Sequence, residues 1–346
     1  MKIELAARDG AVAFDCDADR EILLAGLASG HGVPYECGTG TCATCKATLE
    51  AGEVDEGWAA APARRLLKKE PREILMCQAR PLSDCRLSIR GRLAEPAPMT
   101  PGWARGRIES VTPLNHDILR LEIRPDRPLP FEAGQFMLVD VPEVAGYRGW
   151  SMAAFDAEGR TLVFTVKMMP GGAASNWLQA GDRTGVEVGL FGPMGKATFR
   201  PERDEANLLC IAGGSGLAPI LAILERARAA GHFDRHRADV FFGVRTFGDL
   251  YETRRLLDLA AACPSRIALT FVFSEAMPSA AERASLPGVA FEEGFVHEVM
   301  GRAMAGRFAD ILAYMAGPPP MVEAAMRLLV MQGKVPPARI RYDKFS

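Results

Sequence analysis

The spacing of four cysteines constrains this chain more than any other feature of its sequence. Cys37, Cys42 and Cys45 are separated by four and then by two residues, and Cys77 lies in a distant segment. This Cys-x4-Cys-x2-Cys spacing, completed by a remote fourth cysteine, is typical of a [2Fe–2S] cluster held by four thiolates. The residues between the first three cysteines are Gly, Thr and Ala, so the loop can turn sharply and direct backbone N–H groups toward the sulfur atoms. The sequence therefore predicts a loop that folds around a metal cluster.

A zinc site is the main alternative for these cysteines. Structural zinc sites usually pair two short Cys-x2–4-Cys units, whereas the second half of this site offers only Cys77, with no histidine beside it in the sequence. We therefore expect the cluster ligands to be Cys37, Cys42, Cys45 and Cys77. The remaining cysteines lie in or beside apolar segments and are expected to be inert: Cys16, Cys85, Cys210 and Cys263.

Charge and hydropathy exclude several classes of function. The formal net charge is −2 and the pI is about 6.3, which argues against a nucleic-acid partner because phosphates require a basic surface. No apolar run approaches the roughly 18 residues that a membrane span requires. The first residues alternate polar and apolar like a strand and do not resemble a secretion signal. We expect a cytoplasmic protein, without a membrane partner, that acts as a monomer.

The pattern of apolar residues, glycines and prolines divides the chain into three predicted domains and a linker. Residues 1–93 contain the cysteine cluster, and residues 94–102 form a Pro-rich linker. Residues 103–202 contain short alternating segments broken by Gly and Pro, which predicts a small antiparallel β-barrel. Residues 203–346 alternate strand-like and helix-like segments, which predicts a parallel, Rossmann-like doubly wound α/β sheet that binds ligands beyond the carboxyl ends of its strands.

The first block resembles a plant-type ferredoxin. The resemblance rests on the segments YECGTGTCATCKATLEAGEVD and LMCQARPLSD and implies a β-grasp-like α+β domain that carries the [2Fe–2S] cluster. An acidic stretch follows the cysteine loop, and it has two readings, a solvated turn or an electrostatic docking patch for an electron acceptor. Its members are Glu50, Glu53, Asp55 and Glu56.

The middle block contains the segment Arg148-Gly149-Trp150-Ser151. A cation can neutralise a pyrophosphate, an aromatic ring can stack on a flavin, and a hydroxyl can hydrogen-bond a ring nitrogen. The segment resembles the Arg-x-Tyr-Ser motif of the ferredoxin–NADP reductase superfamily, with Trp150 in place of Tyr. The resemblance implies that Arg148 holds the FAD pyrophosphate and that Ser151 is a catalytic residue near flavin N5. A second phosphate segment is implied at Gly172 and Ser175, for which a plain hairpin turn is the alternative. The candidate FAD residues are Gln135, Arg148, Gly149, Trp150, Ser151, Lys167, Gly172 and Ser175.

Two segments of the last block are candidates for nicotinamide binding. Gly213, Gly214, Ser215 and Gly216 stand between a predicted strand and a predicted helix, where backbone N–H groups and the helix dipole favour a phosphate. The later segment Ala316-Gly317-Pro318 resembles the superfamily's Cys-Gly-Pro-Pro loop beside the nicotinamide, with Ala316 in place of Cys.

The end of the chain and the choice of coenzyme complete the predicted nicotinamide site. The superfamily resemblance makes Phe345 a candidate catalytic residue that covers the flavin face, and a buried Phe on an edge strand is the alternative. Arg245 could meet a 2′-phosphate or form an ion pair, but Asp249, Glu252 and Glu275 lie in the same region, so we expect NADH.

The order of the three domains resembles the reductases of bacterial multicomponent oxygenases, above all soluble di-iron monooxygenases of the toluene and methane type. This resemblance implies an oxidoreductase that passes electrons from NADH through FAD and the cluster to an oxygenase or an intermediary ferredoxin, with a role in aromatic hydrocarbon catabolism. The reductase of a Rieske dioxygenase and a non-catalytic redox sensor remain alternatives. A self-sufficient oxygenase is disfavoured because Glu-x-x-His pairs and Rieske ligands are missing from the sequence.

Overall fold

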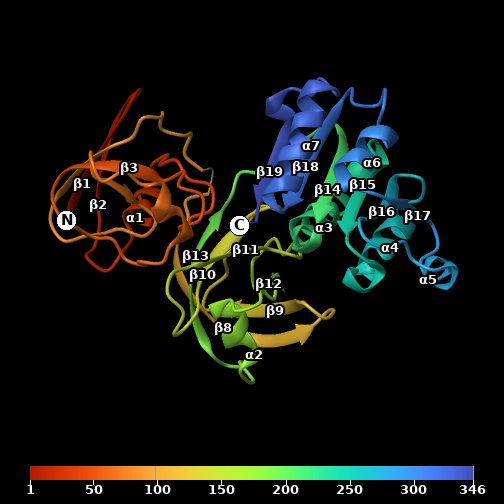
Figure 1. The fold of residues 1–346 in the computed structure, drawn as a ribbon, viewed down its shortest axis with the longest axis horizontal. Coiled ribbons are helices and arrows are strands. Elements are labelled where there is room, and N and C mark those ends of the chain that lie inside the picture. The colour runs from red at the N-terminus through yellow and green to blue at the C-terminus, as the bar shows by residue number, and fades with distance from the viewer. Residues whose placement is uncertain (98, 346) are drawn as a thin grey trace.

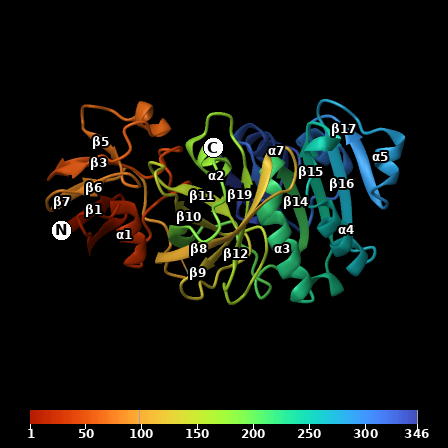
Figure 2. The same cartoon turned by 90° about the horizontal axis from the view of Figure 1, so that it is seen from below.

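Three large sheets organise the chain and follow one another along the sequence (Figure 1). The computed structural model describes residues 1–97 and 99–345, so Pro98 of the predicted linker lies outside the described residues. The N-terminal domain lies at one end, the second sheet is central, and the third domain lies at the other end (Figure 2). The C-terminus returns to the centre of the molecule in both views. Within the described ranges, no helix is long and apolar enough to cross a membrane.

The N-terminal domain is a five-stranded mixed sheet of order β2-β1-β7-β3-β5 with one helix against it. In β1, Ile3 and Leu5 point into the core and alternate with exposed residues, as the period of a half-buried strand requires. The parallel pair β1–β7 between antiparallel neighbours matches the predicted β-grasp-like domain. The elements are β1 (Lys2–Ala7), β2 (Gly10–Asp15), α1 (Ile22–Ala28), β3 (Lys46–Ala51), β4 (Val54–Asp55), η1 (Pro62–Leu66), β5 (Glu73–Leu75), β6 (Arg80–Pro81) and β7 (Cys85–Ser88).

The central domain is an antiparallel sheet of order β11-β10-β13-β8-β9-β12 that curls into a barrel. A bridge between Met152 and Phe164 joins the chain just after β11 to β12, so the two edges of the sheet meet. Closure removes free strand edges and leaves an apolar interior. The elements are β8 (Gly102–Pro113), β9 (Ile118–Pro125), β10 (Phe136–Asp140), β11 (Arg148–Ser151), β12 (Leu162–Lys167), α2 (Ala173–Gln179) and β13 (Glu187–Met194).

The third domain is a parallel sheet of order β17-β16-β15-β14-β18-β19. Its two faces bury separate apolar cores, one against α3 and α4 and the other against α6 and α7, which confirms the predicted doubly wound fold. The order reverses beside β14, where such sheets bind nucleotides. The strands are β14 (Asn207–Gly213), β15 (Ala238–Val244), β16 (Ile267–Phe273), β17 (Val289–Glu293), β18 (Ile311–Gly317) and β19 (Ile340–Lys344). The helices are α3 (Leu217–Ala229), α4 (Thr253–Ala262), α5 (Ala280–Ala284), α6 (Val296–Ala303) and α7 (Pro319–Met331), with 3-10 turns η2 (Gly214–Gly216), η3 (His232–Asp234), η4 (Phe247–Asp249) and η5 (Pro337–Arg339).

Candidate cofactor sites

The four cysteines of the predicted cluster converge as two pairs of thiols. The thiols of Cys37 and Cys42 interact with each other, and so do those of Cys45 and Cys77. The neighbouring thiol of Cys42 lowers the pKa of Cys37, whereas the neighbouring thiol of Cys77 and burial raise the pKa of Cys45. Two converging pairs suit a two-iron cluster, because each pair can take one iron.

Hydrogen-bond donors surround these sulfur atoms. The backbone N of Thr39 lies 3.4 Å from Cys37 Sγ, and Gln78 Nε2 lies 3.5 Å from Cys77 Sγ. Ala43 adopts a left-handed backbone conformation with φ of 60°, which lets the loop turn around its centre. Four thiols with inward donors and no disulfide among them fit an iron–sulfur cluster bound by these residues.

The side chain of Arg148 lies over the N-terminal domain. Its guanidinium donates to three loop carbonyls, and its Cζ atom lies 5.3 Å from the centre of the Trp58 ring. Burial lowers the pKa of Arg148. Among residues 1–97 and 99–345, no carboxylate forms an ion pair with it. A desolvated cation without a carboxylate fits an anionic ligand such as the FAD pyrophosphate.

Ser151 is joined to a carboxylate that the sequence analysis did not assign. Ser151 Oγ donates to Asp343 Oδ2 over 2.9 Å, and Ser151 is buried. Burial raises the pKa of Asp343 to about 6, against the lowering effect of the serine hydrogen bond. Asp343 lies on β19, two residues before Phe345. A carboxylate on the last strand of a predicted nucleotide-binding sheet was the signal in the sequence that could have identified this residue.

The other predicted flavin residues are engaged by protein partners. Gln135 Oε1 accepts a hydrogen bond from the backbone N of Glu132 over 2.7 Å, and Ser175 Oγ accepts one from that of Met169 over 2.8 Å. The rings of Trp150 and Phe164 pack with their centres 6.2 Å apart, and Gly172 precedes α2. On β12, the buried Thr165 Oγ1 has no hydrogen-bond partner in the described structure. An orphaned buried hydroxyl in the barrel fits a polar ligand atom there.

The two segments predicted to bind the nucleotide lie against each other. A Cβ atom at Gly216 would lie 1.9 Å from the carbonyl O of Ala316, and one at Gly317 would lie 2.9 Å from that of Gly213. Glycine is required there because the ends of β14 and β18 approach so closely. The structure thus brings together Gly213, Gly214, Ser215, Gly216, Ala316, Gly317 and Pro318.

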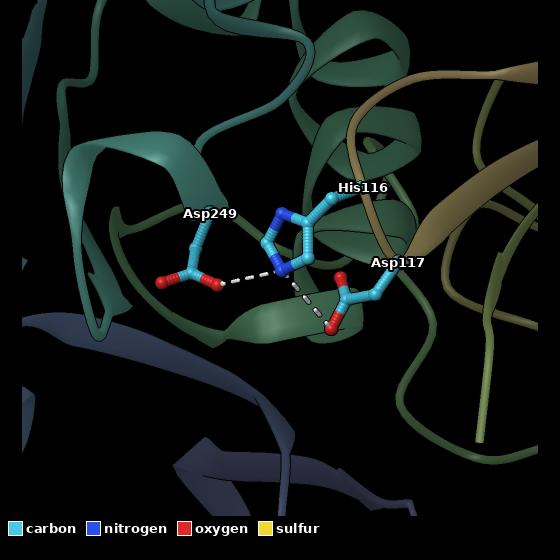
Figure 3. Close-up of side chains that lie close together, drawn as sticks. All are labelled: His116, Asp117 and Asp249. Atoms are coloured by element: carbon cyan, nitrogen blue, oxygen red, sulfur yellow. Dashed lines mark ion pairs between the residues drawn. The ribbon is translucent and has the colours of Figure 1, made fainter. Parts of the chain in front are cut away.

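A charged cluster joins the barrel to the third domain (Figure 3). His116 Nε2 lies 3.5 Å from Asp249 Oδ1 and 3.8 Å from Asp117 Oδ2. Lys167 pairs with Asp117 over 2.6 Å, and Arg245 pairs with Asp249 over 3.0 Å. Although this geometry could hold a metal ion, both carboxylates already have a cationic partner. Arg245 therefore forms the ion pair that was its alternative role, which leaves its charge compensated and suits NADH.

The flavin segment lies between the cysteine loop and the last strand. A Cβ atom at Gly149 would lie 3.5 Å from Thr39 Cγ2 and 3.6 Å from the carbonyl O of Cys37. The backbone N of Phe345 donates to the carbonyl O of Gly317 over 3.0 Å, which places the predicted aromatic residue beside the nucleotide segment. The candidate sites for cluster, flavin and nicotinamide therefore form one continuous region.

Three family profiles match the chain in the same order. They are the 2Fe-2S iron-sulfur cluster binding domain over residues 7–82, the oxidoreductase FAD-binding domain over 106–199 and the oxidoreductase NAD-binding domain over 210–327. The reductase component DmpP of phenol 2-monooxygenase from Pseudomonas sp. (strain CF600) is 34% identical over 96% of this chain and 91% of its own. The chain belongs to the reductase components of multicomponent oxygenases.

Other members of this reductase family agree over the full length. The ferredoxin–NAD(P)+ reductase CarAd of Metapseudomonas resinovorans is 32% identical over 97% of this chain and 98% of its own. Among solved structures, the ferredoxin reductase of carbazole 1,9a-dioxygenase superposes with a TM-score of 0.84 at 30% identity, covering 100% of this chain and 99% of its own. The Amycolatopsis cytochrome P450 reductase GcoB gives 0.78 at 30% identity, covering 99% and 98%.

These comparisons confirm the predicted family, fold class and cofactors. The protein is an NADH-dependent flavin iron–sulfur oxidoreductase with FAD and a [2Fe–2S] cluster. The assignment of individual residues to these cofactors stays a prediction.

Proposed function

We propose that this reductase passes electrons from NADH to the oxygenase component of a soluble di-iron monooxygenase. The observation that carries the proposal is the position of the flavin segment, with Gly149 against the cysteine loop and Ser151 bonded to Asp343 on the last strand. An electron carrier needs its donor, flavin and cluster side by side in this order. When bound, FAD accepts a hydride from NADH and the cluster accepts electrons singly, so a two-electron donor serves a one-electron acceptor.

Individual residues of this chain have distinct tasks in the proposal. Arg148 binds the pyrophosphate of FAD, because its guanidinium is desolvated and faces no carboxylate in the described structure. Ser151 orients the reacting edge of the flavin through its hydroxyl, and Asp343 holds that hydroxyl in place. Because its pKa is raised to about 6, Asp343 can also take up or release a proton near neutral pH at Oδ2.

Gly149 and the ends of β14 and β18 have positioning tasks in the proposal. Gly149 keeps the flavin segment close to Cys37, because a branched side chain there would press on Thr39. The close approach of Gly216 to Ala316 shapes the floor on which the coenzyme lies.

The names of the relatives support a monooxygenase as the acceptor. Reductase components of alkene monooxygenase from Xanthobacter autotrophicus and of propane 2-monooxygenase from Mycolicibacterium goodii share 31% and 29% identity with this chain. An aromatic-ring dioxygenase is the second candidate, and the structural similarity to the reductase of carbazole 1,9a-dioxygenase favours it. We further propose that the protein acts as a monomer, because one chain carries all three predicted cofactor sites. We also propose that it works in the cytoplasm, since its eight cysteines are free thiols and suit a reducing compartment.

An absorption spectrum followed by anaerobic titration tests the proposal. We expect overlapping flavin and iron–sulfur bands that bleach with NADH and much less with NADPH. Reoxidation by a purified di-iron hydroxylase, but not by a ring-hydroxylating dioxygenase, would identify the acceptor class. A protein without flavin, or one that neither coenzyme bleaches, would contradict the proposal and favour a redox sensor.

A further inference from the structure

A basic loop lies beside the predicted cluster. This loop, residues 62–72 with the sequence PARRLLKKEPR, contains five cationic residues and one carboxylate, although the whole chain carries a net charge of −2. Most of its side chains are exposed. The loop begins with the 3-10 turn η1 and ends where β5 enters the core. The charge of this surface is therefore opposite in sign to that of the molecule.

The basic loop is bonded directly to the cysteine loop. The backbone N of Ala63 donates to the carbonyl O of Gly40 over 2.9 Å, and a Cβ atom at Gly40 would lie 3.1 Å from Ala61 Cβ. Gly38, on the other hand, faces Leu138 of the barrel, with 3.1 Å between that side chain and a Cβ built on Gly38. The cysteine loop thus contacts the flavin-binding domain at Cys37, Gly38 and Thr39, and it contacts the basic loop through a different residue, Gly40.

Some cationic side chains of the basic loop are available to bind another molecule. Arg64 and Arg72 both pair with Glu56. Arg65 and Lys69 form no ion pair with any residue in the described ranges, and both are exposed. An exposed cation that has no internal partner can attract an opposite charge on another molecule.

A large apolar side chain lies among these cations. Leu66 is 54% exposed although it stands between Arg65 and the partly buried Leu67. Apolar residues ringed by charge are typical of protein docking sites, because the apolar centre loses water while the rim steers the encounter.

The acidic stretch that follows the cysteine loop does not provide such a surface. Residue by residue, β3 carries the chain away from Cys45, so Glu50 lies at the far end of a strand roughly 15 Å long. Asp55 accepts a hydrogen bond from the backbone N of Gly57 over 3.0 Å, and Glu56 is neutralised by two arginines. The solvated-turn reading therefore describes this stretch better than the docking reading.

We propose that the basic loop is the docking surface for the electron acceptor, and that the acceptor presents an acidic surface with an apolar centre beside its own redox group. This inference rests on the proposed function. The loop is positioned for the task, because it adjoins the cysteine loop at Gly40 and leaves the barrel contact at Gly38 undisturbed. Long-range attraction would raise the encounter rate, and Leu66 would stabilise the complex once formed.

The test uses the full chain with its cofactors and two haem proteins of opposite charge, acidic cytochrome b5 and basic cytochrome c. The variant R65E/K69E reverses two free charges of the loop. We expect its second-order rate of cytochrome b5 reduction to fall about tenfold at low ionic strength and to approach the wild-type rate at high salt. Its affinity for cytochrome b5, measured calorimetrically with both proteins oxidised, should weaken in parallel, and cytochrome c reduction should accelerate.

Two further variants separate the docking surface from general charge effects. R302E/R327E makes the same change of net charge at exposed positions on α6 and α7 and should stay within about twofold of wild type. Leu66→Ser should weaken cytochrome b5 binding without changing its salt dependence, because it removes only apolar contact.

The outcomes distinguish this inference from the proposed function. Equal losses in R65E/K69E and R302E/R327E, or a loss that salt does not relieve, would overturn the docking surface. Binding of the loop to anionic phospholipid vesicles or to a second copy of the chain, with unchanged cytochrome b5 rates, would overturn it as well. A wild-type protein whose flavin and cluster do not bleach with NADH would instead overturn the proposed function.

Discussion

The barrel makes two junctions of different character. Its junction with the ferredoxin-like domain is mainly apolar, and side chains of both domains share one core. The barrel contributes Phe136, Leu138, Phe191 and Met194. Across the described residues, no ion pair crosses this junction, and the backbone N of Gly195 donates a hydrogen bond to the Tyr35 hydroxyl over 3.0 Å.

The junction with the nicotinamide domain depends more on charge. Arg120 of the barrel pairs with Glu252 over 3.1 Å, and Ser151 donates to Asp343. His116 lies 3.5 Å from Asp249, in the cluster that Figure 3 shows. Apolar residues also meet here, but ion pairs add a dependence on salt and pH that should be weaker at the first junction, where the charged side chains make cation–π contacts such as that of Arg148 with Trp58.

The difference suggests a division of labour. Apolar burial holds the flavin segment against the cysteine loop whatever the ionic strength, so the distance that electrons cross stays constant. The ion pairs of the polar junction can weaken or strengthen with salt and pH, and such adjustable contacts suit a surface where a coenzyme must enter and leave.

Loss of a cluster ligand should abolish electron transfer across the apolar junction and leave reduction of the flavin by NADH intact. Cys77→Ala removes a buried thiol that pairs with Cys45, so we expect loss of the iron–sulfur absorption and of electron transfer to protein acceptors. Bleaching of the flavin by NADH should persist because it depends on the other junction. The matched variant Cys85→Ala removes another buried thiol of the same domain and should keep the cluster. A Cys77→Ala protein with a full cluster would contradict the ligand assignment.

A cavity at the apolar junction should slow electron transfer to the cluster. Leu138→Ala deletes a fully buried side chain against the cysteine loop and should cost about 2–5 kcal/mol of unfolding free energy. Leu162→Ala deletes an equally buried side chain inside the barrel, away from the junction. Denaturant unfolding should show similar losses for both, whereas stopped-flow absorbance should show slower cluster reduction only in Leu138→Ala. Equal rates of cluster reduction in Leu138→Ala and Leu162→Ala would contradict this role of the apolar junction.

The polar junction should depend on pH through Asp343. The pKa of this carboxyl is 3.8 in the unfolded chain and about 6 in the folded protein, so the native state binds the extra proton between these values. Stability should therefore fall by about 2 kcal/mol as pH rises from 4 to 6 and then stay level. Chemical denaturation across this range should show the slope in the wild type and its loss in Asp343→Asn. A slope that survives in Asp343→Asn would assign it to another group.

Coenzyme choice should respond weakly to the charged cluster. Asp249→Asn removes the carboxylate that compensates Arg245, so the freed guanidinium should improve kcat/KM for NADPH about fivefold. The control Asp258→Asn breaks an ion pair with Arg254 on the exposed face of α4 and should leave the preference unchanged. An unchanged preference in Asp249→Asn would mean that Arg245 does not face the 2′-position.

The sequence predicted what local spacing encodes and missed contacts between distant segments. The cysteine spacing was sufficient to predict the cluster. The change from strand-like segments to alternating strand-like and helix-like segments after the barrel was sufficient to predict the fold class. Both patterns depend on residues that are neighbours in the chain. The bond between Ser151 and Asp343 joins residues 192 positions apart, and no periodicity reports such a pair. Trp58 beneath Arg148 was missed for the same reason.

Distance along the chain also fails to report distance in space where a strand intervenes. The acidic stretch is near the cysteines in sequence, but the extended backbone of β3 moves Glu50 away from Cys45. The basic loop is farther along the chain, yet the hydrogen bond between Ala63 and Gly40 brings it to the cluster.

The order in which the flavin and the cluster are reduced tests whether electrons enter at the polar junction and leave through the apolar one. The measurement is anaerobic rapid mixing with NADH, with the flavin and cluster bands followed separately in the intact protein and in protein stripped of FAD. We expect the flavin absorbance to fall first, cluster bleaching to follow, and the cluster to stay oxidised without FAD. Cluster bleaching that precedes the flavin change, or that occurs in the stripped protein, would contradict it.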